Sequence, residues 1–227
     1  MSGSITDRLF ITYRAPAGAL RRLVPAPLEL DEREGCGFVS VCAVEIVNMG
    51  LAWTPRWLRW DNRELLYRIA ARYRGASTFL TLQSHVSSRR LALLGRHFSH
   101  YRPRLSQVQL SRSHERVRFS VTTQDGAGDA CLDVSREATP VPASVFASDV
   151  EATQFLLGMD FSVDVVGRRV RAQYIDHTPW RPCFAQVVHA RFAYLEQLQR
   201  RVGVQLTLDS ALVTGGVQQV WRAAQWL

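Results

Sequence analysis

Short segments in which apolar and polar residues alternate dominate this chain, and turns rich in glycine, proline and aspartate separate them. Alternation with a period of two is typical of β-strands whose two faces meet different surroundings. A long succession of such segments favours a β-rich barrel or sandwich. The predicted strands are Leu9–Arg14, Gly37–Val47, Glu64–Arg74, Ser77–Val86, Leu105–Arg112, Glu115–Thr123, Cys131–Arg136, Phe161–Val166, Arg169–Ile175 and Val213–Trp221, with glycine-rich hairpins at 125–129 and 166–168.

Helices are predicted only at the joints between strands. A segment between two prolines suits a short helix, a serine and a glutamate three residues apart form a capping box, and an apolar stripe at helical spacing indicates a longer helix. These helices are Ala17–Val24 between Pro16 and Pro25, the segment from Ser148 and Glu151 to Gly158, and Phe184–Arg201.

Length and composition indicate one globular domain over residues 1–227. The chain is long enough to bury a substantial core, 47% of its residues are hydrophobic, and no linker rich in proline, glycine or serine divides it. Residues 1–14 lack the basic and apolar segments of a signal peptide, and no stretch approaches the ~18 apolar residues of a membrane span. We therefore expect a cytoplasmic protein without a membrane partner.

The formal charge of +8 raises the question of nucleic-acid binding. All 28 basic residues are arginine and none is lysine, and they occur singly or in pairs instead of as a basic tail. We expect a dispersed basic surface and no nucleic-acid partner. The cysteines are too widely spaced for a zinc site, so we expect free and mostly buried thiols at Cys36, Cys42, Cys131 and Cys183.

Two predicted strands carry charges that need an explanation. In Glu64–Arg74, the alternation places Glu64 and Arg68 on the same face, and composition alone favours water over a polar lumen for that face. In Gly37–Val47 both faces are apolar, so Glu45 is expected to be buried and either paired, hydrogen-bonded or protonated. A functional carboxylate and a structural salt bridge to an arginine are both compatible with this position.

Short motifs are spread over nearly the whole chain. They are Ile11-Thr12-Tyr13-Arg14, Ala19-Leu20-Arg21 with Leu23-Val24-Pro25-Ala26-Pro27-Leu28, Val44-Glu45-Ile46, Gly95-Arg96-His97-Phe98-Ser99-His100-Tyr101, His177-Thr178-Pro179-Trp180 and Val217-Gln218-Gln219-Val220-Trp221. Together they resemble the acetoacetate decarboxylase-like superfamily, and the last two resemble its uncharacterised YqjF-like branch. The resemblance implies a β-rich α+β fold: a closed or cone-shaped antiparallel β-barrel with a central cavity and a few short peripheral helices.

The same resemblance implies a set of cavity residues. Decarboxylases of this superfamily place an arginine, two glutamates and a Schiff-base lysine in the cavity. By motif position, the arginine corresponds to Arg8 and the glutamates to Glu45 and Glu64, whereas the reactive lysine falls on Pro103 and its lysine neighbour on Arg104. Proline has no side-chain amine and arginine stays protonated, so the resemblance implies the barrel without Schiff-base chemistry.

Polar residues cluster around the position of the missing lysine. His97 and His100 are candidates for general acid or base, Arg96 for clamping a carboxylate, and Tyr101 for donating to a carbonyl oxygen. Arg68 joins the substrate-binding candidates if its strand face points into the lumen. The alternative is a polar connection whose histidines are solvated. No third metal ligand follows by spacing, so we expect neither a metal nor a cofactor.

Two functions are compatible with these residues. The first is an enzyme, a lyase, isomerase or hydrolase, that acts on a keto acid or another small carbonyl compound by acid/base chemistry with Glu45, Glu64 and the His97/His100 region. The second is a non-catalytic barrel that binds a small hydrophobic or anionic molecule. A homo-oligomer is a further possibility, because sheet edges need to be covered.

No nucleotide-binding loop and no nucleophile elbow is present in the sequence. The loop 51–60 carries Trp53, Trp57 and Trp60, which are expected either to roof the cavity and stack on a ligand or to pack against the end of the barrel.

Overall fold

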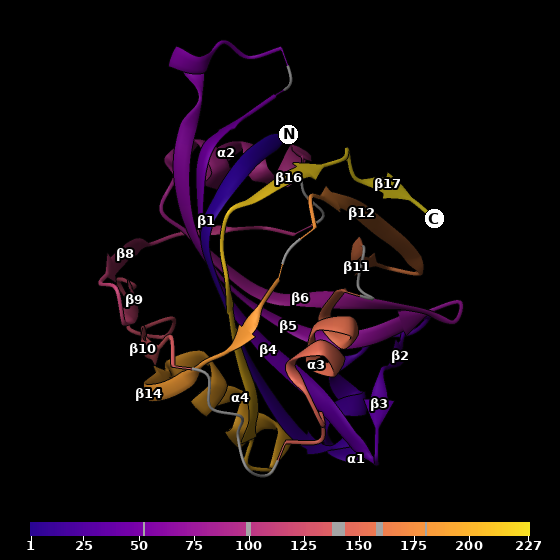
Figure 1. Cartoon of the computed structure of the whole chain (residues 1–227). Helices are drawn as coiled ribbons and strands as arrows, with labels where there is room; N and C mark the ends of the chain where they lie inside the picture. Colours follow the sequence, from indigo (N-terminus) through magenta and orange to yellow (C-terminus); the bar gives the residue numbers. More distant parts are fainter. Residues whose placement is uncertain (52, 99–100, 138–143, 158–160, 180) are drawn as a thin grey trace.

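Figure 1 shows a computed structural model of the chain. The structure describes residues 1–227 except 52, 99–100, 138–143, 158–160 and 180, and it leaves the side chains of 94, 96–98, 149, 156 and 157 undescribed.

The larger of two sheets closes on itself as a ring. Its strands follow one another in the order β1 (Ser2–Pro16), β16 (Val217–Trp221), β12 (Arg169–His177), β11 (Phe161–Val166), β6 (Ala76–Val86), β5 (Trp60–Tyr73) and β4 (Cys36–Gly50), and β4 then pairs with β1 (Figure 1). Neighbours in the ring are antiparallel except β6 and β11, which are parallel. The expected strand-rich fold class is confirmed.

Six further strands extend the edges of the ring. They are β2 (Glu29–Leu30), β3 (Glu32–Arg33), β7 (Arg104–Leu105), β13 (Cys183–Phe184), β15 (Thr207–Thr214) and β17 (Gln225–Trp226).

The single strand predicted over Val213–Trp221 is wrong, because β15 and β16 are separate strands. Both pair with β1, β15 along Arg8–Arg14 and β16 along Ser2–Ile5. Between them Gly216 adopts φ of +70°, and a Cβ on Gly215 would lie 2.3 Å from the backbone oxygen of Thr6. Glycine therefore lets the chain change pairing partners at this point.

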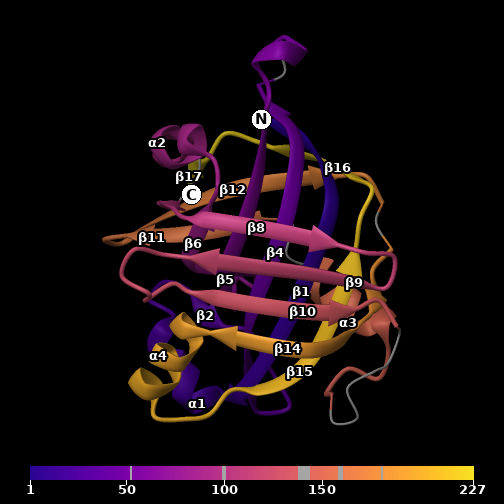
Figure 2. The ribbon, with the colours of Figure 1, turned by 90° about the vertical axis from the view of Figure 1, so that its left-hand side faces the viewer.

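The smaller sheet lies across the outer face of β1, β4 and β5 (Figure 2). It is antiparallel, in the order β14 (Gln186–Phe192), β10 (Ala130–Ser135), β9 (Arg116–Thr122), β8 (Gln107–Arg112). Fully or almost fully buried side chains from both sheets, including Val39, Leu65, Tyr67, Phe119 and Leu132, form the core between the layers.

The helices lie at the joints: α1 (Ala17–Leu20) and the 3-10 turn η1 (Arg21–Leu23), η2 (Arg56–Leu58), α2 (Arg89–Phe98), α3 (Asp149–Leu157) and α4 (Ala193–Val202). The predicted capping box is formed in part before α3: Ser148 Oγ accepts a 3.1 Å hydrogen bond from the backbone N–H of Glu151, whereas the Glu151 carboxylate accepts one of 2.6 Å from the N–H of Ala147. The helix predicted over Phe184–Arg201 is wrong in its first half, because β14 pairs with β10 there.

No helix among the described residues is long and apolar enough to cross a membrane.

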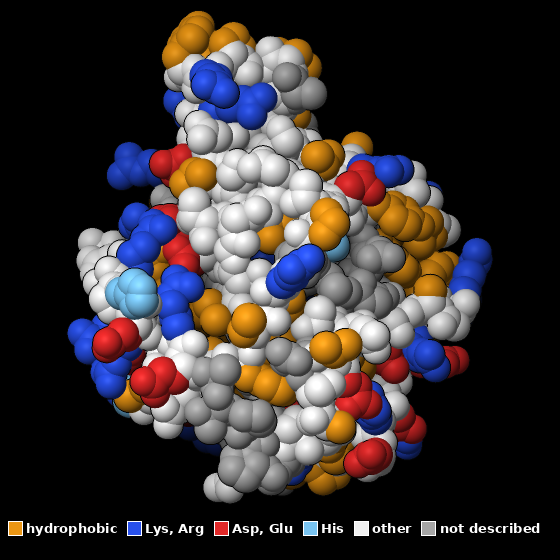
Figure 3. Space-filling view, in the orientation of Figure 1, with side chains coloured by type: hydrophobic (Ala, Val, Ile, Leu, Met, Phe, Trp, Pro, Cys, Tyr) orange, Lys and Arg blue, Asp and Glu red, His pale blue; other side chains and the backbone are white. Residues whose placement is uncertain are grey.

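Strands β4 and β5 extend beyond the ring and end in a projecting tip, at the top of Figure 1. Trp53 and Trp57 on this tip are 79% and 80% exposed, and Figure 3 shows hydrophobic and basic side chains at its apex. Both residues lie outside the lining of the ring cavity described below. The expectation that they roof the cavity or pack against the ring is therefore wrong for Trp53 and Trp57, whereas Trp60 is half-buried and packs against the core as the second alternative expected.

The contact at Gly215 predicts a selective loss of stability. In Gly215→Ala the new methyl group would press on the backbone of Thr6, and we expect the free energy of unfolding to fall by about 1–3 kcal/mol. Gly18→Ala is the matched control, because a Cβ there meets nothing within 4 Å and alanine favours the helix, so stability should stay equal or rise by up to about 1 kcal/mol. Urea denaturation measures both. Equal stability of Gly215→Ala and the wild type would contradict the prediction, because the backbone of β1 would then shift at Thr6 without a cost in free energy.

Candidate functional site

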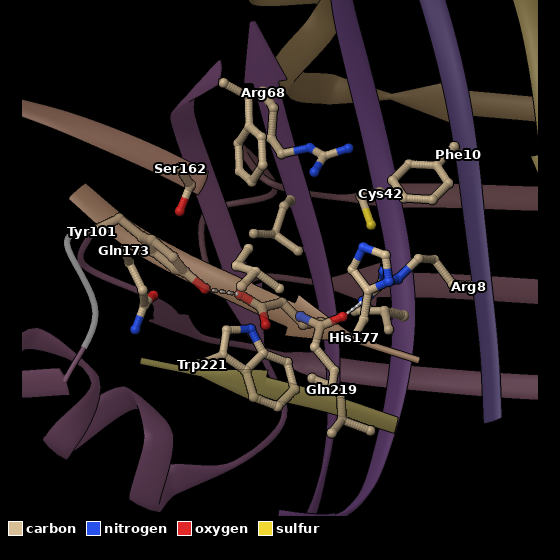
Figure 4. Close-up of a pocket in the computed structure, with 16 residues that line it drawn as sticks. Arg8, Phe10, Cys42, Arg68, Tyr101, Ser162, Gln173, His177, Gln219 and Trp221 are labelled. Atoms are coloured by element: carbon tan, nitrogen blue, oxygen red, sulfur yellow. Dashed lines mark hydrogen bonds between the residues drawn. The ribbon is translucent and has the colours of Figure 1, made fainter. Parts of the chain in front are cut away.

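The inside of the ring is divided between an aromatic cluster and a cavity. Phe38 on β4 packs against Phe146 and Phe155, with ring centroids 5.7 Å and 5.1 Å away. The remaining space is a cavity of about 80 Å³ (Figure 4). Its polar lining residues are Arg8, Cys42, Glu64, Arg68, Tyr101, Ser162, Gln173, His177 and Gln219.

Strand alternation decides which side chains reach this cavity. On β5, Glu64 and Arg68 point inward, whereas Leu65 and Tyr67 point outward into the core between the sheets. Glu64 is 4% exposed and Arg68 is 8% exposed. From composition, the face that carries Glu64 and Arg68 was expected to contact water. This prediction is wrong, because the ring closes around that face.

Glu64 is the only carboxylate among the described residues that line the cavity. Its Oε1 accepts hydrogen bonds of 2.8 Å from Ser84 Oγ and from Tyr101 Oη. Burial raises the pKa of Glu64, and these hydrogen bonds and the charges of Arg8 and Arg68 only partly oppose it. Glu64 therefore takes up a proton more readily than an ordinary glutamate.

Tyr101 stays a neutral phenol at physiological pH. Burial and the neighbouring Glu64 raise its pKa well above the ordinary value for tyrosine. The phenol is therefore a hydrogen-bond donor, and in the structure it donates to Glu64.

Arg68 is buried in the cavity without a carboxylate partner among the described residues. Its guanidinium lies over the ring of Phe79, 4.2 Å from the centroid, and 5.1 Å from that of Phe10. Its Nε is buried and has no hydrogen-bond partner. Burial lowers the pKa of Arg68, although the group remains a cation at neutral pH.

Arg8 brings a second guanidinium to the cavity from β1. It donates a short hydrogen bond to Gln219 Oε1, and burial lowers its pKa to about 10. The described lining residues thus contribute two arginines against one glutamate, which gives the cavity an excess of positive charge.

Glu45 lies on the opposite face of β4 from the cavity. Its neighbour Val44 lines the cavity, so Glu45 points outward, where it accepts 2.7 Å and 2.9 Å hydrogen bonds from Thr6 and Arg63 and forms an ion pair with Arg112. Arg112 also binds Asp7, which Arg136 contacts at 2.6 Å. The expectation that Glu45 and Glu64 share one interior is corrected: Glu45 belongs to an ionic network between the two sheets.

This network also sets the charge state of Glu45. Burial alone would raise its pKa, but the hydrogen bonds from Thr6 and Arg63 and the charges of Arg112 and Arg63 outweigh burial and lower it. Glu45 therefore stays ionised and has a structural role.

Of the other predicted site residues, the structure describes the side chain of Tyr101 but not those of Arg96, His97 and His100. Tyr101 lies at the cavity, whereas Pro103, the position of the superfamily's lysine, does not line it. His100 lies outside the described residues, and the side chains of Arg96 and His97, on α2, are outside the description as well.

Sequence reasoning missed several cavity residues. His177 and Gln219 stood in the two motifs of the YqjF-like branch, but nothing in the sequence showed that β12 and β16 face the same interior. Cys42 could have been found from strand parity with Val44. It is the single buried cysteine: Cys36 is half-buried and Cys131 and Cys183 are exposed, so the expectation of mostly buried thiols is wrong.

The fold is that of acetoacetate decarboxylase-like proteins. The structure is similar to acetoacetate decarboxylase from Legionella pneumophila, with a TM-score of 0.68, 14% identity, and 100% of this chain and 86% of that chain covered. It is also similar to an acetoacetate decarboxylase-like enzyme from Sphingomonas wittichii RW1, with a TM-score of 0.64, 11% identity, and 100% and 92% covered. The enduracididine biosynthesis enzyme MppR complexed with pyruvate gives a TM-score of 0.64, 12% identity, and 99% and 88% covered.

The family follows from the sequence. The model of the family DUF2071, described as an uncharacterized conserved protein (COG2071), matches residues 3–213, and the chain belongs to this family. The expected superfamily and its YqjF-like branch are confirmed. No curated protein matches the chain.

The placement of Glu45 predicts an effect on stability that depends on pH. Glu45→Gln should lower the free energy of unfolding at pH 7 by about 1–3 kcal/mol, because two arginines lose a charged partner. The folded-state pKa lies below the ordinary 4.5, so the stabilisation is present above about pH 4.5 and is lost as the pH falls through the folded pKa. Denaturant titrations at several pH values measure this, with the exposed Glu115→Gln as control. A pH-independent difference would contradict the assignment.

Proposed function

We propose that this protein binds a small keto acid, or a similar carbonyl compound with a carboxylate, in the ring cavity and catalyses a proton transfer on it without a Schiff base. The observation that carries the proposal is the buried Arg68, which faces the same cavity as Arg8 and Glu64.

A bound carboxylate would neutralise the excess positive charge of this cavity. Glu64 is the one carboxylate near Arg68 in the described lining, but it accepts its hydrogen bonds from Ser84 and Tyr101. A buried cation that forms no ion pair is costly, and a carboxylate ligand that forms charge-assisted hydrogen bonds with a guanidinium offsets the cost. The cavity volume of about 80 Å³ suits only a small molecule, since drug-sized ligands need roughly 300–1,000 Å³. The complex of MppR with pyruvate supports this ligand class, because that protein has a similar fold.

Glu64 is the group that we assign to proton transfer. Its raised pKa brings it closer to neutral pH, where a general acid or base works best. Arg8 or Arg68 would stabilise negative charge that develops on the carbonyl oxygen, and Tyr101 would hold Glu64 in place. Removal of a proton next to a carbonyl is the first step of enolisation, aldol-type and dehydration reactions, which places the activity among lyases and isomerases.

A non-catalytic binder is the second candidate. It is favoured by the fact that Glu64 already accepts two hydrogen bonds, from Ser84 and Tyr101, as a carboxylate with a structural role would. The two candidates share the ligand and differ in turnover.

Arg68 should determine affinity for the carboxylate. We expect Arg68→Gln to weaken pyruvate binding by about tenfold or more, because a charge-assisted hydrogen bond is lost, and to leave any binding of the uncharged acetone unchanged. Arg72→Gln on the same strand is the control, since Arg72 pairs with Asp31 and lies outside the cavity lining. Isothermal titration calorimetry measures the affinities. If the wild type does not bind pyruvate or a series of other 2-oxo and 3-oxo acids, the ligand class is wrong.

Glu64 should determine turnover. If it removes a proton from bound pyruvate, the methyl protons exchange with D₂O, and Glu64→Gln should slow this exchange by about 10²–10⁴-fold while binding persists. Because a base acts in its ionised form, the wild-type rate should fall as the pH drops, with a midpoint above the ordinary 4.5. Proton NMR measures the exchange, with Glu45→Gln as the control that keeps the rate. Binding without exchange in the wild type would favour the non-catalytic candidate.

A further inference from the structure

Trp53 and Trp57, on the projecting tip of β4 and β5, are the two most exposed large hydrophobic side chains among the described residues. Each is about four-fifths exposed, and they lie on the tip together with Leu58, which is 37% exposed (Figures 1 and 3). Exposed apolar side chains that gather on one feature of a surface often mark an interaction site. The tip therefore needs an explanation that the cavity does not provide.

The tip is an ordered structure that holds its tryptophans outward. Thr54 N–H donates to the backbone oxygen of Leu51 at 2.9 Å, and Leu58 N–H donates to that of Pro55 at 3.0 Å. Arg90 on α2 braces the base, where its Nη1 donates to the backbone oxygen of Leu58 at 2.9 Å and its guanidinium lies 5.6 Å from the ring centre of Trp60. The exposure of Trp53 and Trp57 is thus built into the fold.

The charged residues nearest the tryptophans in the sequence are basic, and the exposed Asp61 follows at the base of the tip, where its Oδ1 accepts a 3.0 Å hydrogen bond from Asn48 N–H. The segment from Gly50 to Trp60 contains Arg56 and Arg59 and no acidic residue, and Arg89 and Arg90 follow on α2. Tryptophan is the side chain most typical of the boundary between lipid headgroups and acyl chains, and arginines beside it attract anionic headgroups.

We propose that the tip is a membrane-docking site at which Trp53 and Trp57 insert into the headgroup region of an anionic lipid bilayer, while Arg56 and its neighbours contact the headgroups. This contact is peripheral and needs no spanning helix. The proposal differs from the expectation of no membrane partner, which considered only signal and spanning segments.

A second copy of the chain is a less suitable occupant. Two tryptophans contribute roughly 300–500 Å² of buried surface, whereas a stable dimer needs about 800 Å² from each partner. The chain also carries a net charge of +8, so another copy offers little charge complementary to the arginines of the tip.

Vesicle sedimentation tests the proposal. The full chain should bind vesicles of phosphatidylcholine and phosphatidylglycerol in equal parts, bind pure phosphatidylcholine at least about tenfold less, and lose binding as the salt concentration rises. The double variant Trp53→Ser/Trp57→Ser and the variant Arg56→Glu should each weaken binding by about tenfold or more. The controls are Trp226→Ser, an exposed tryptophan away from the tip, and Arg200→Glu, an exposed arginine on α4.

Two results would overturn the proposal. One is equal sedimentation of the double variant and the wild type with anionic vesicles. The other is a wild-type dimer that the double variant converts into a monomer in light scattering, without vesicle binding, since the tip would then be an interface between copies. Circular dichroism and urea denaturation, measured in parallel, show that the variants are folded, and neither readout depends on the proposed cavity function.

Discussion

Pairing of β1 with β4 is the constraint on which the rest of this structure depends. The two strands pair from Ser2 opposite Gly50 to Pro16 opposite Cys36, with two shifts of register before Asp7, and this contact turns an extended sheet into a ring. A closed ring has an inside, and side chains that point there are removed from water whatever their chemistry. The burial of Glu64, Arg68 and Arg8, and with it every shift of their pKa values, follows from closure.

The outer face of the same strands is governed by a different interaction. Asp7 and Glu45 are register partners on β1 and β4, and arginines of the smaller sheet and its flank meet them there. The ring thus carries one set of charges that is neutralised within the protein and another, in the cavity, in which arginine is in excess. The first set is a structural device, and the ligand that we propose would neutralise only the second.

Much of this arrangement could be predicted from local sequence patterns. The alternation in Glu64–Arg74 correctly separated Leu65 and Tyr67 from Glu64 and Arg68, because side-chain parity is a local property of a strand. Which face of β5 points to the inside depends on ring closure, which is a contact between the distant strands β1 and β4. Because local sequence does not show this contact, the charged face was assigned to water. The assignment of Glu45 by motif failed for a related reason: a matching motif fixes a position in the chain but does not fix on which side of the sheet it lies. β14 was predicted as helix because its strand partner, β10, is about 55 residues away.

The alternation on β5 has a consequence for how such a family can diverge. Because cavity residues and core residues alternate along one strand, a substitution at an inward position changes the lining of the cavity and leaves the outward side chains Leu65 and Tyr67 in the core. The insertion of a single residue would exchange the two sets and bring charges into the core unless a β-bulge absorbed it, as register shifts do elsewhere between β1 and β4 and between β5 and β6. On this scaffold a substitution at an inward position is therefore a smaller disturbance than an insertion.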